Sequence, residues 1–316
     1  MHLLVITARY PTADRPAAGT FVRDRLGARP SERGEPASDT TRTTVVAPDR
    51  YDVPGVVRYA RLTWRALTAR GRFDGVECHF VLPSGMVGLL AARVRRLPLV
   101  VVAHGSDVGA IAHRTPIHRW LAKLVLRGAG AVVANSPATA AAVAELGAPA
   151  EVVPPGVDLE RFAPRPRPPV RRVLYVGGDV PGKGVAVARR LAHTLVGPGI
   201  REVPPEEMPV LLAQHDVLLM PSQAEGFGLA AAEAIAAGRW VVATAVGGLV
   251  DVVSDGVNGT LVRDGDYATA LAQVPVYDPN TVAATAERFD VTRQREQMTE
   301  IWSRVLATRE KRLTRQ

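Results

Sequence analysis

The sequence has 316 residues, of which 47% are hydrophobic and 22% charged, a composition typical of a folded protein and not of a disordered one. This length allows two domains of ordinary size, each with a core of its own. The single cysteine, Cys78, excludes an intrachain disulfide and favours a reducing, cytoplasmic location.

The net charge of +8 attracts anions in general, among them nucleotide diphosphates, lipid headgroups and nucleic acids. Aromatic residues make up only 5% of the chain and are not interleaved with the basic ones, so we expect no nucleic-acid partner. We expect no membrane-spanning segment, although a basic surface allows peripheral contact with the inner face of an anionic membrane. The sequence does not set the oligomeric state.

Short runs of Leu, Val and Ile alternate along the chain with Ala- and Leu-rich stretches of helical character. Continuously apolar runs are typical of parallel strands covered on both faces, and their alternation with helices predicts a doubly wound α/β architecture. The expected strands are Leu3–Ile6, Thr44–Ala47, Leu99–Ala103, Ala131–Ala134, Val173–Val176, Val217–Met220 and Trp240–Ala243. The expected helices are Thr20–Gly27, Ile117–Arg127, Pro137–Leu146, Leu229–Ala237 and, last, Thr292–Arg304.

The first strand leads into a loop that contains Gly19 and Thr20, which are placed to face a phosphate or an acceptor. Closely spaced glycines directly after that strand are absent, which disfavours a dehydrogenase. The polar segment Arg29–Arg42 is expected to be a mobile loop.

His104 stands where the strand Leu99–Ala103 ends, in the segment AHGSD. A histidine at that position is either a structural residue or part of a site at the carboxyl edge of the sheet. Asp107 is a candidate cap of the next helix. His113 and His118 lack the spacing of metal ligands.

A proline-rich segment, residues 154–169, is the best domain boundary because proline at that density ends helices and central strands. We therefore predict an N-terminal Rossmann-like domain at residues 1–155 and a C-terminal one at residues 156–285. Residues 286–316 are expected to form a helix that crosses back to the N-terminal domain.

The segment 172–191 has the pattern of a strand, a glycine-rich loop and a helix, with Lys183 inside the loop. The lysine ammonium is suited to neutralise a diphosphate leaving group. The pattern is one residue short of a phosphate-loop NTPase, because Gly184 stands where a Ser or Thr should hold magnesium.

The strongest motif is the segment 216–240, in which a strand is followed by a glycine-bearing loop and an alanine-rich helix. Glu225 lies in that loop and Glu233 in the second turn of the helix. The two carboxylates are either solvated surface acids or acceptors for sugar hydroxyls beside a phosphate at the helix N-terminus.

Asp264 and Asp266 have the spacing of a metal-binding pair, but Asp266 is placed to cap a helix that starts near Tyr267. We therefore expect no metal site.

With these residues in place, the chain resembles the family 4 retaining glycosyltransferases of GT-B fold. Glu225 and Glu233 match the family's Glu-x7-Glu signature within EGFGL, and the resemblance extends over VVATAVGGLVDVVSDGVNGTLV, PPGVDLERF, NSPAT and AHGSD. The resemblance implies two Rossmann-like doubly wound domains that face each other across a cleft. It also implies transfer, with retention of configuration, from a nucleotide sugar to a hydroxyl of a small-molecule, lipid or glycan acceptor.

The resemblance also implies roles for individual residues. Lys183 would pair with the diphosphate, Glu233 with the ribose and Glu225 with hydroxyls of the donor sugar. His104 would join Glu225 and Lys183 in catalysis. The other donor-binding positions are Gly19, Gly178, Phe227, Gly228 and Leu229. Relatives need no metal or cofactor, and a UDP-sugar is the expected co-substrate of an enzyme in bacterial carbohydrate or natural-product biosynthesis.

Two departures from the family pattern are visible. Relatives carry an arginine where this chain has Gly178, so the second cation is missing or is supplied by Arg23, Arg171 or Arg201. The stretch from Lys183 to Pro221 is also short. Two alternatives therefore stay open: a phosphate-loop-like NTPase or kinase, and a pseudo-glycosyltransferase that binds a nucleotide sugar without transferring it.

Overall fold

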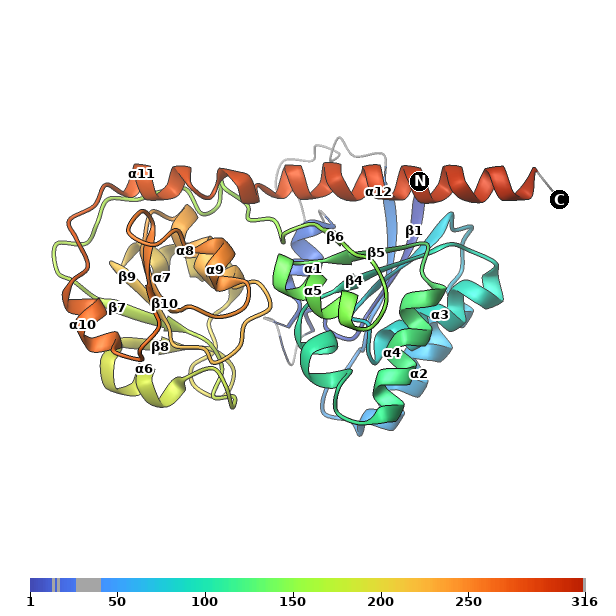
Figure 1. Cartoon of the computed structure of the whole chain (residues 1–316), viewed down its shortest axis with the longest axis horizontal. Helices are drawn as coiled ribbons and strands as arrows, with labels where there is room; N and C mark the ends of the chain where they lie inside the picture. The colour runs from blue at the N-terminus through green and yellow to red at the C-terminus, as the bar shows by residue number, and fades with distance from the viewer. Residues whose placement is uncertain (13–14, 16–17, 27–40, 315–316) are drawn as a thin grey trace. The chain divides into compact units, whose positions relative to one another are not determined.

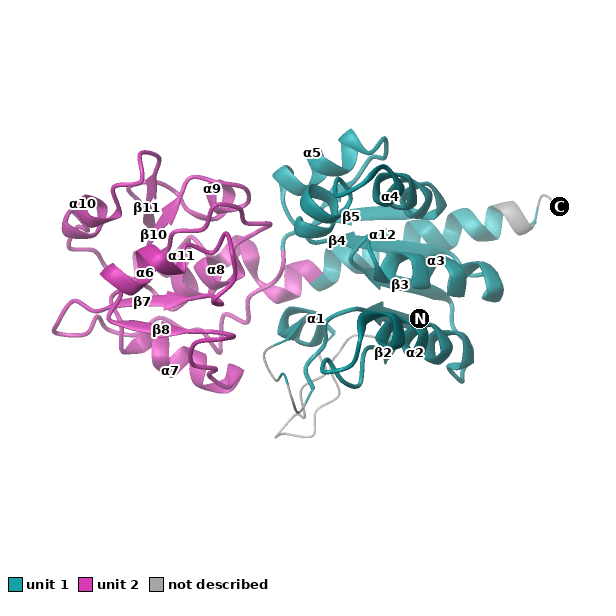
Figure 2. Cartoon of the chain, turned by 90° about the horizontal axis from the view of Figure 1, so that it is seen from below, with its two compact units in different colours: residues 1–154, 295–316 teal, residues 155–294 magenta. Residues whose placement is uncertain are grey.

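The computed structural model describes residues 1–12, 15, 18–26 and 41–314. Two compact units are present, and they are coloured separately in Figure 2. Unit 1 comprises residues 1–154 and 295–316, and unit 2 comprises residues 155–294. Most of the predicted mobile loop, residues 29–40, lies outside the described residues.

Unit 1 is built on a six-stranded parallel sheet whose strand order is β2-β1-β3-β4-β5-β6 (Figure 1). Its strands are β1 (His2–Thr7), β2 (Arg42–Val46), β3 (Gly75–His79), β4 (Leu99–Ala103), β5 (Ala131–Ala134) and β6 (Glu151–Val152). Its helices are α1 (Thr20–Arg25), α2 (Gly55–Thr68), α3 (Ser84–Arg95), α4 (Pro116–Gly128), α5 (Pro137–Glu145) and a short π-helix at Asp107–Ile111.

Helices cover both faces of this sheet because its strands are apolar on both sides. Leu4 and Ile6 of β1 belong to the core cluster shared with α3 and α4, whereas Leu3 and Val5 belong to a second cluster. That second cluster includes Met298, Ile301 and Trp302 of the last helix, α12 (Val291–Leu313). Figure 1 shows α12 along one side of the sheet and α2, α3 and α4 on the other.

Unit 2 is built on a five-stranded parallel sheet in the order β11-β10-β9-β7-β8. Its strands are β7 (Val173–Val176), β8 (Thr194–Val196), β9 (Val217–Met220), β10 (Trp240–Thr244) and β11 (Gly259–Val262). Its α-helices are α6 (Val185–Leu191), α7 (Met208–Ala213), α8 (Leu229–Ala236), α9 (Leu249–Val252), α10 (Tyr267–Ala272) and α11 (Pro279–Ala284). Short 3-10 turns lie at Pro205–Glu207 and Glu287–Phe289.

The seven strands expected from the sequence are all present, as are the five expected helices. The sequence analysis missed β3, β6, β8 and β11, together with several helices. Two of the missed strands, β6 and β8, have only two and three residues and so carry little pattern. Within the described residues, no helix combines the length and the apolarity that crossing a membrane requires.

Candidate functional site

Two loops of unit 2 flank the point where the strand order of its sheet reverses. One is the glycine-rich loop that contains Lys183, called the lysine loop, and the other is the loop that contains Glu225. β7 and β9 are neighbours, with β8 on one side of them and β10 and β11 on the other. In open parallel sheets, ligands bind beyond the carboxyl ends of the strands at such a switch point. The lysine loop follows β7 and the Glu225 loop follows β9, so the topology brings together two motifs that are far apart in the sequence.

Lys183 and Glu225 form an ion pair at this point, with 2.7 Å between Nζ and Oε2. The hydroxyl of Ser222 donates to the same carboxylate oxygen at 3.5 Å. The lysine side chain is 36% exposed and the glutamate 15%, so a ligand can reach the pair from solvent. The cation and the anion that the sequence predicted separately are therefore one charged pair.

Glycines let the two loops approach each other closely. Gly184 has a positive φ of 70°, and a Cβ at this position would lie 2.0 Å from the carbonyl oxygen of Pro221. The N–H of Gln223 donates to the carbonyl of Gly182 at 2.8 Å. The buried Tyr175 hydroxyl lies 3.2 Å from the carbonyl oxygens of both Gly178 and Lys183, which share its one proton as acceptors. Tyr175 was not predicted; its position next to the glycines was the available signal.

The helix α8 begins at Leu229, four residues after Glu225. Gly228 precedes the helix with a φ of 96°, and no side chain caps it. The first N–H groups of a helix have no partner within the helix, so those near Gly228 and Leu229 can bind an anion. Phe227 is only 4% exposed, and its ring packs edge-on against Phe289. Glu233, the fifth residue of α8, is half-buried.

A third loop, residues 245–248 after β10, supports the Glu225 loop and was missed by the sequence analysis. The N–H of Gly248 donates to the carbonyl of Glu225 at 3.1 Å. A Cβ on Gly247 would lie 1.9 Å from the same oxygen, so only glycine fits there. Two adjacent glycines directly after a strand were the signal for this contact.

Arg171, one of the three suggested replacements for the missing cation, is at the wrong edge of the sheet. It precedes β7, and its guanidinium donates to the carbonyls of Leu271 and Val274 at 3.0 and 2.8 Å. Arg201 follows β8 and accepts the N–H of Gly197 through its carbonyl at 2.8 Å. Arg201 is therefore at the same edge as the lysine loop. Arg23 belongs to unit 1, where it pairs with Asp24 at 2.9 Å.

In unit 1 the strand order reverses between β1 and β3, and Thr7 and His79 face each other at the ends of these strands. Gly19 precedes α1 with a φ of 66°, and a Cβ there would lie 2.3 Å from the carbonyl oxygen of Arg9. The predicted position of Gly19 after the first strand thus coincides with a close approach of two backbone segments.

His104 follows β4, at the same edge. Its Nε2 lies 3.0 Å from Nδ1 of His79, and the rings of Phe80 and Phe21 lie 4.4 and 4.8 Å from its ring. Burial is the main cause that holds the pKa of both histidines well below the usual 6.5. His104 is therefore a neutral hydrogen-bonding group at neutral pH.

Asp107 does not cap the next helix, because it lies inside the π-helix that Ser106 precedes. Its buried carboxylate instead accepts the N–H groups of Val81 and His104 at 2.6 and 3.0 Å. Asp107 thus ties the His104 loop to the end of β3, because it satisfies two backbone donors that would otherwise be buried without partners.

Asp266 accepts the N–H of Thr269 at 3.0 Å and caps α10, as the sequence predicted. The described part of the chain contains no cluster of three His, Cys, Asp or Glu side chains that could hold a metal ion.

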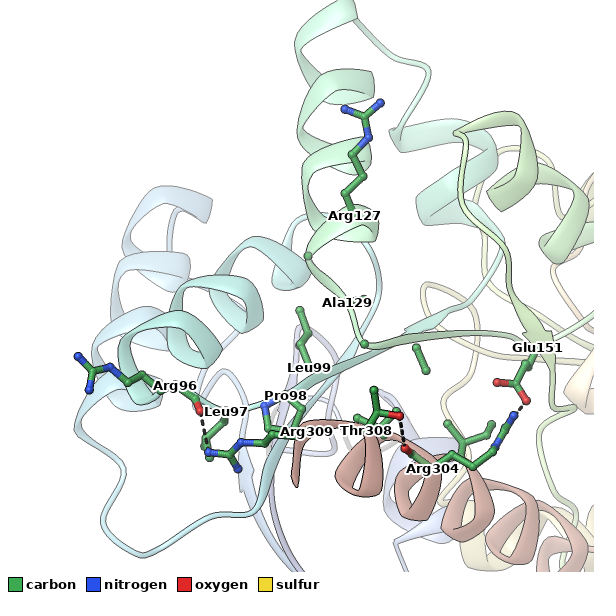
Figure 3. Close-up of a pocket in the computed structure, with 15 residues that line it drawn as sticks. Arg96, Leu97, Pro98, Leu99, Arg127, Ala129, Glu151, Arg304, Thr308 and Arg309 are labelled. Carbon is green, nitrogen blue, oxygen red and sulfur yellow. Dashed lines mark hydrogen bonds and ion pairs between the residues drawn. The ribbon is translucent and has the colours of Figure 1, made fainter. Parts of the chain in front are cut away.

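A hollow of about 580 Å³ in unit 1 is not a candidate active site. It lies at the amino ends of β4 and β5 beside α12, at the edge opposite His104, and its lining includes Arg96, Arg127 and Arg304 (Figure 3). In that view Arg96 and Arg127 point away from each other, and Arg304 is directed at Glu151. The positive charges therefore do not converge on one ligand position.

Two family models match the chain. One is described as Glycosyltransferase Family 4 and matches residues 20–161, and the other is described as Glycosyl transferases group 1 and matches residues 159–275. The D-inositol 3-phosphate glycosyltransferase of Geodermatophilus obscurus is 35% identical over 270 residues, which cover 65% of this chain and 60% of that protein. The protein of the same name from Kribbella flavida is 29% identical, with 84% of this chain and 79% of that protein covered. The chain spans about three fifths of the length of several of its curated relatives.

Solved structures show the same fold over nearly the whole chain. Sucrose-phosphate synthase from Thermosynechococcus elongatus has a TM-score of 0.73 at 19% identity, with 98% of this chain and 100% of that chain covered. Anabaena Alr3699/HepE in complex with UDP-glucose has a TM-score of 0.71 at 20% identity, with 96% and 99% covered. Given these matches and the Glu225-x7-Glu233 motif at the switch point of unit 2, the chain belongs to the family 4 glycosyltransferases and has the GT-B fold of two Rossmann-like domains.

Proposed function

We propose that this chain is a retaining glycosyltransferase that moves a sugar from a UDP-sugar to a hydroxyl of a small-molecule, lipid or glycan acceptor. The observation that carries the proposal is the Lys183–Glu225 ion pair beside the uncapped N-terminus of α8. A nucleoside diphosphate needs cations and N–H donors, and a sugar needs a carboxylate acceptor close to them.

In the proposed complex, the diphosphate takes over Lys183 from Glu225, and the released carboxylate accepts hydroxyls of the donor sugar. Glu233 accepts hydrogen bonds from the ribose, and the backbone of Gly178, Phe227, Gly228 and Leu229 contacts the phosphates or the sugar. Positive charge from Lys183 and the helix N-terminus stabilises the diphosphate as it leaves. We therefore expect transfer without an added divalent metal or cofactor.

The reaction breaks the bond between the anomeric carbon and the diphosphate oxygen and forms a bond from that carbon to the acceptor oxygen on the same face. The proton of the acceptor hydroxyl passes to the leaving phosphate oxygen, so no additional base is required. Unit 1 is proposed to supply Gly19 and His104 to this reaction, His104 as a neutral hydrogen-bonding group for the sugar.

UDP is the first nucleotide to test because Alr3699/HepE, which shares the fold, has been solved with UDP and with UDP-glucose. We propose that the chain acts in the bacterial cytoplasm, in the biosynthesis of a carbohydrate or natural product. We further propose that it makes peripheral contact with the inner face of the membrane.

A second candidate is the phosphate-loop-like NTPase, because Gly177, Gly182 and Lys183 keep that spacing. The structure gives a reason against it, since Gly184 is forced by contact with Pro221 and so no Ser or Thr hydroxyl can stand there for magnesium.

Calorimetric titration of the chain with UDP, GDP, ADP and magnesium-ATP tests the proposal. One nucleoside diphosphate should bind without metal, and Lys183→Ala should weaken it by about tenfold to hundredfold, the value of a charge-assisted hydrogen bond. Lys123→Ala, on α4 of unit 1, is the matched control and should bind as the wild type does. Binding of magnesium-ATP alone would replace the proposal with the NTPase reading.

An activity assay distinguishes the proposed transferase from the remaining alternative, a pseudo-glycosyltransferase. UDP binding without UDP release from UDP-glucose, across a panel of hydroxyl acceptors, would indicate a pseudo-glycosyltransferase. Transfer with retention would exclude that alternative.

A further inference from the structure

A chain of buried polar side chains runs from α12 to His104 along one face of unit 1. The indole N–H of Trp302 donates to Oε2 of Glu77 at 3.0 Å, and Oε1 of Glu77 lies 3.1 Å from Nε2 of His79. Nδ1 of His79 lies in turn 3.0 Å from Nε2 of His104. Trp302, Glu77 and His79 are each about 1% exposed or less.

The alternation of β3 explains why these groups meet. Val76 and Cys78 belong to the core cluster on the α3 side, so Gly75, Glu77 and His79 face α12. Gly75 makes room for the tryptophan, because a Cβ there would lie 2.3 Å from the Trp302 ring. Two polar side chains buried on the α12 face of a central strand destabilise the fold unless both have hydrogen-bond partners. The hydrogen bonds of Glu77 and His79 are therefore required by the fold.

We propose that Glu77 and His79 are positioning residues of the transfer reaction, which fix the ring orientation and the tautomer of His104, and that Trp302 of α12 holds Glu77 in place. This inference rests on the proposed role of His104 towards the donor sugar. It adds residues that do not themselves touch the substrate.

The contacts determine which atom is the donor and which the acceptor in each hydrogen bond of this chain. Trp302 donates to Glu77, and Arg25 forms a buried ion pair with it, so Glu77 is an ionised acceptor. An ionised carboxylate takes the Nε2 proton of His79, which leaves Nδ1 of that ring as an acceptor. Burial keeps both histidines neutral by lowering the pKa of each, so the single ring proton of His104 lies on Nε2, towards His79.

Nδ1 of His104 is then left with its lone pair. Among the described residues it has no hydrogen-bond partner that the structure shows, which leaves it to accept a hydrogen bond from a hydroxyl of a ligand. The reverse order of protons is the competing arrangement, because Nη2 of Arg25 also lies 2.9 Å from Nε2 of His79. In that arrangement Arg25 donates to His79, and His104 offers a donor instead of an acceptor.

Nitrogen-15 NMR of the histidine side chains in the full chain distinguishes the two arrangements without any substrate. His104→Gln assigns the signals among the seven histidines. We expect a protonated Nε2 and a bare Nδ1 for His104 in the wild type. A protonated Nδ1, or a mixture of both tautomers, would overturn the proposal.

The His79→Phe variant keeps a ring in the core and removes both nitrogens. It should leave the Nε2 proton of His104 without a fixed partner and lower the rate of UDP release from UDP-glucose by about tenfold to hundredfold, as for other residues that orient a ligand-binding group. The affinity for UDP should stay within about twofold, since Lys183 is untouched. Trp302→Phe removes the donor to Glu77 together with part of the buried ring, leaves His79 in place, and should have a smaller effect of the same kind.

Cys78→Ala is the matched control, because Cys78 is fully buried in the same strand but faces the other core. If it slowed UDP release as much as His79→Phe does, the effect would be one of packing and the proposal would be wrong. Failure of UDP to bind the wild type would instead refute the proposed function, while the NMR result would still decide the tautomer.

Discussion

The two units place polar groups at their switch points in opposite ways. In unit 2, Lys183 and Glu225 are charged, partly exposed and paired with each other, so a ligand can exchange with either partner. In unit 1, His79 and His104 are neutral, and their hydrogen bonds lead inwards to Glu77 and α12. Under the proposed function, unit 2 would supply charge to the reaction, whereas unit 1 would supply a neutral group whose orientation is fixed by its hydrogen bonds.

Glu225→Gln tests the charged half of this comparison and should have the largest effect. The change removes the carboxylate and frees Lys183, so UDP affinity should be unchanged or higher. The rate of sugar transfer should fall by about a hundredfold to a thousandfold, the range seen when one preorganised polar group of an active site is removed. UDP release from UDP-glucose and calorimetry with UDP measure the two effects.

Glu206→Gln is the control, because Glu206 is an exposed acid of the same unit in the 3-10 turn before α7. Full activity of Glu225→Gln would show that Glu225 does not hold the sugar. Loss of UDP affinity in parallel with activity would show that the loop had been disrupted instead.

Gly184→Ala and Gly182→Ala test whether the two loops of unit 2 depend on their close contact. Both glycines have a positive φ, but a Cβ on Gly184 meets the Pro221 carbonyl at 2.0 Å, whereas nothing lies within 4 Å of a Cβ on Gly182. Gly182→Ala should lower the free energy of unfolding by about 1 kcal/mol. Gly184→Ala should lower it by about 3 kcal/mol and should also abolish UDP binding. Urea denaturation of both variants checks this, and equal costs would mean that the contact is not maintained in solution.

The sequence predicts the architecture well because the parallel strands are continuously apolar. It also locates Lys183 and Glu225, but only the strand order shows that their loops are neighbours, because β8, a strand too short to predict, sets the sheet edge. The roles of the individual site residues stay predictions until they are measured.

Unit 1 was harder to predict for a physical reason. β3 alternates buried polar and apolar residues, so Glu77 and His79 interrupt the apolar run that marks the other strands. The partner that satisfies Glu77 is Trp302, which lies 225 positions later. No local pattern connects two residues so far apart, so the helix that crosses back was expected but its contact with Glu77 was not.

The two neutral histidines of unit 1 predict that the stability of the fold depends on pH. His79 and His104 have folded-state pKa values well below 6.5, so below pH 6.5 the unfolded chain binds protons that the folded chain does not. The free energy of unfolding should therefore fall as the pH falls from 6.5 to 5.5, by about 1 kcal/mol for each of the two rings. His215 of unit 2 acts in the same direction, because burial lowers its pKa as well.

Urea unfolding of the wild type and of His79→Phe at both pH values separates these contributions. The variant should lose part of the dependence, because one of the buried neutral rings no longer titrates. Asp107 opposes the trend, because burial raises the pKa of its carboxyl above 3.8, and the folded state therefore takes up this proton before the unfolded state does as the pH falls. An identical pH dependence in the variant would mean that His79 is not buried as a neutral ring.

Gly178→Arg should have the smallest effect of these variants, a change in UDP affinity. It tests the proposal that unit 2 supplies charge to the reaction. Gly178 has no positive φ, and a Cβ there would meet the flexible Val180 side chain at 2.9 Å and the Pro198 carbonyl at 3.3 Å, so an arginine can be accommodated with a small shift. A second cation beside Lys183 should tighten UDP binding by about twofold to fivefold, as a partly exposed charge pair does. Calorimetry with UDP at low and at high salt measures the gain, which should shrink as salt screens it. If Gly178→Arg left UDP affinity unchanged while Arg201→Ala in the wild type weakened it, Arg201 would already supply that charge.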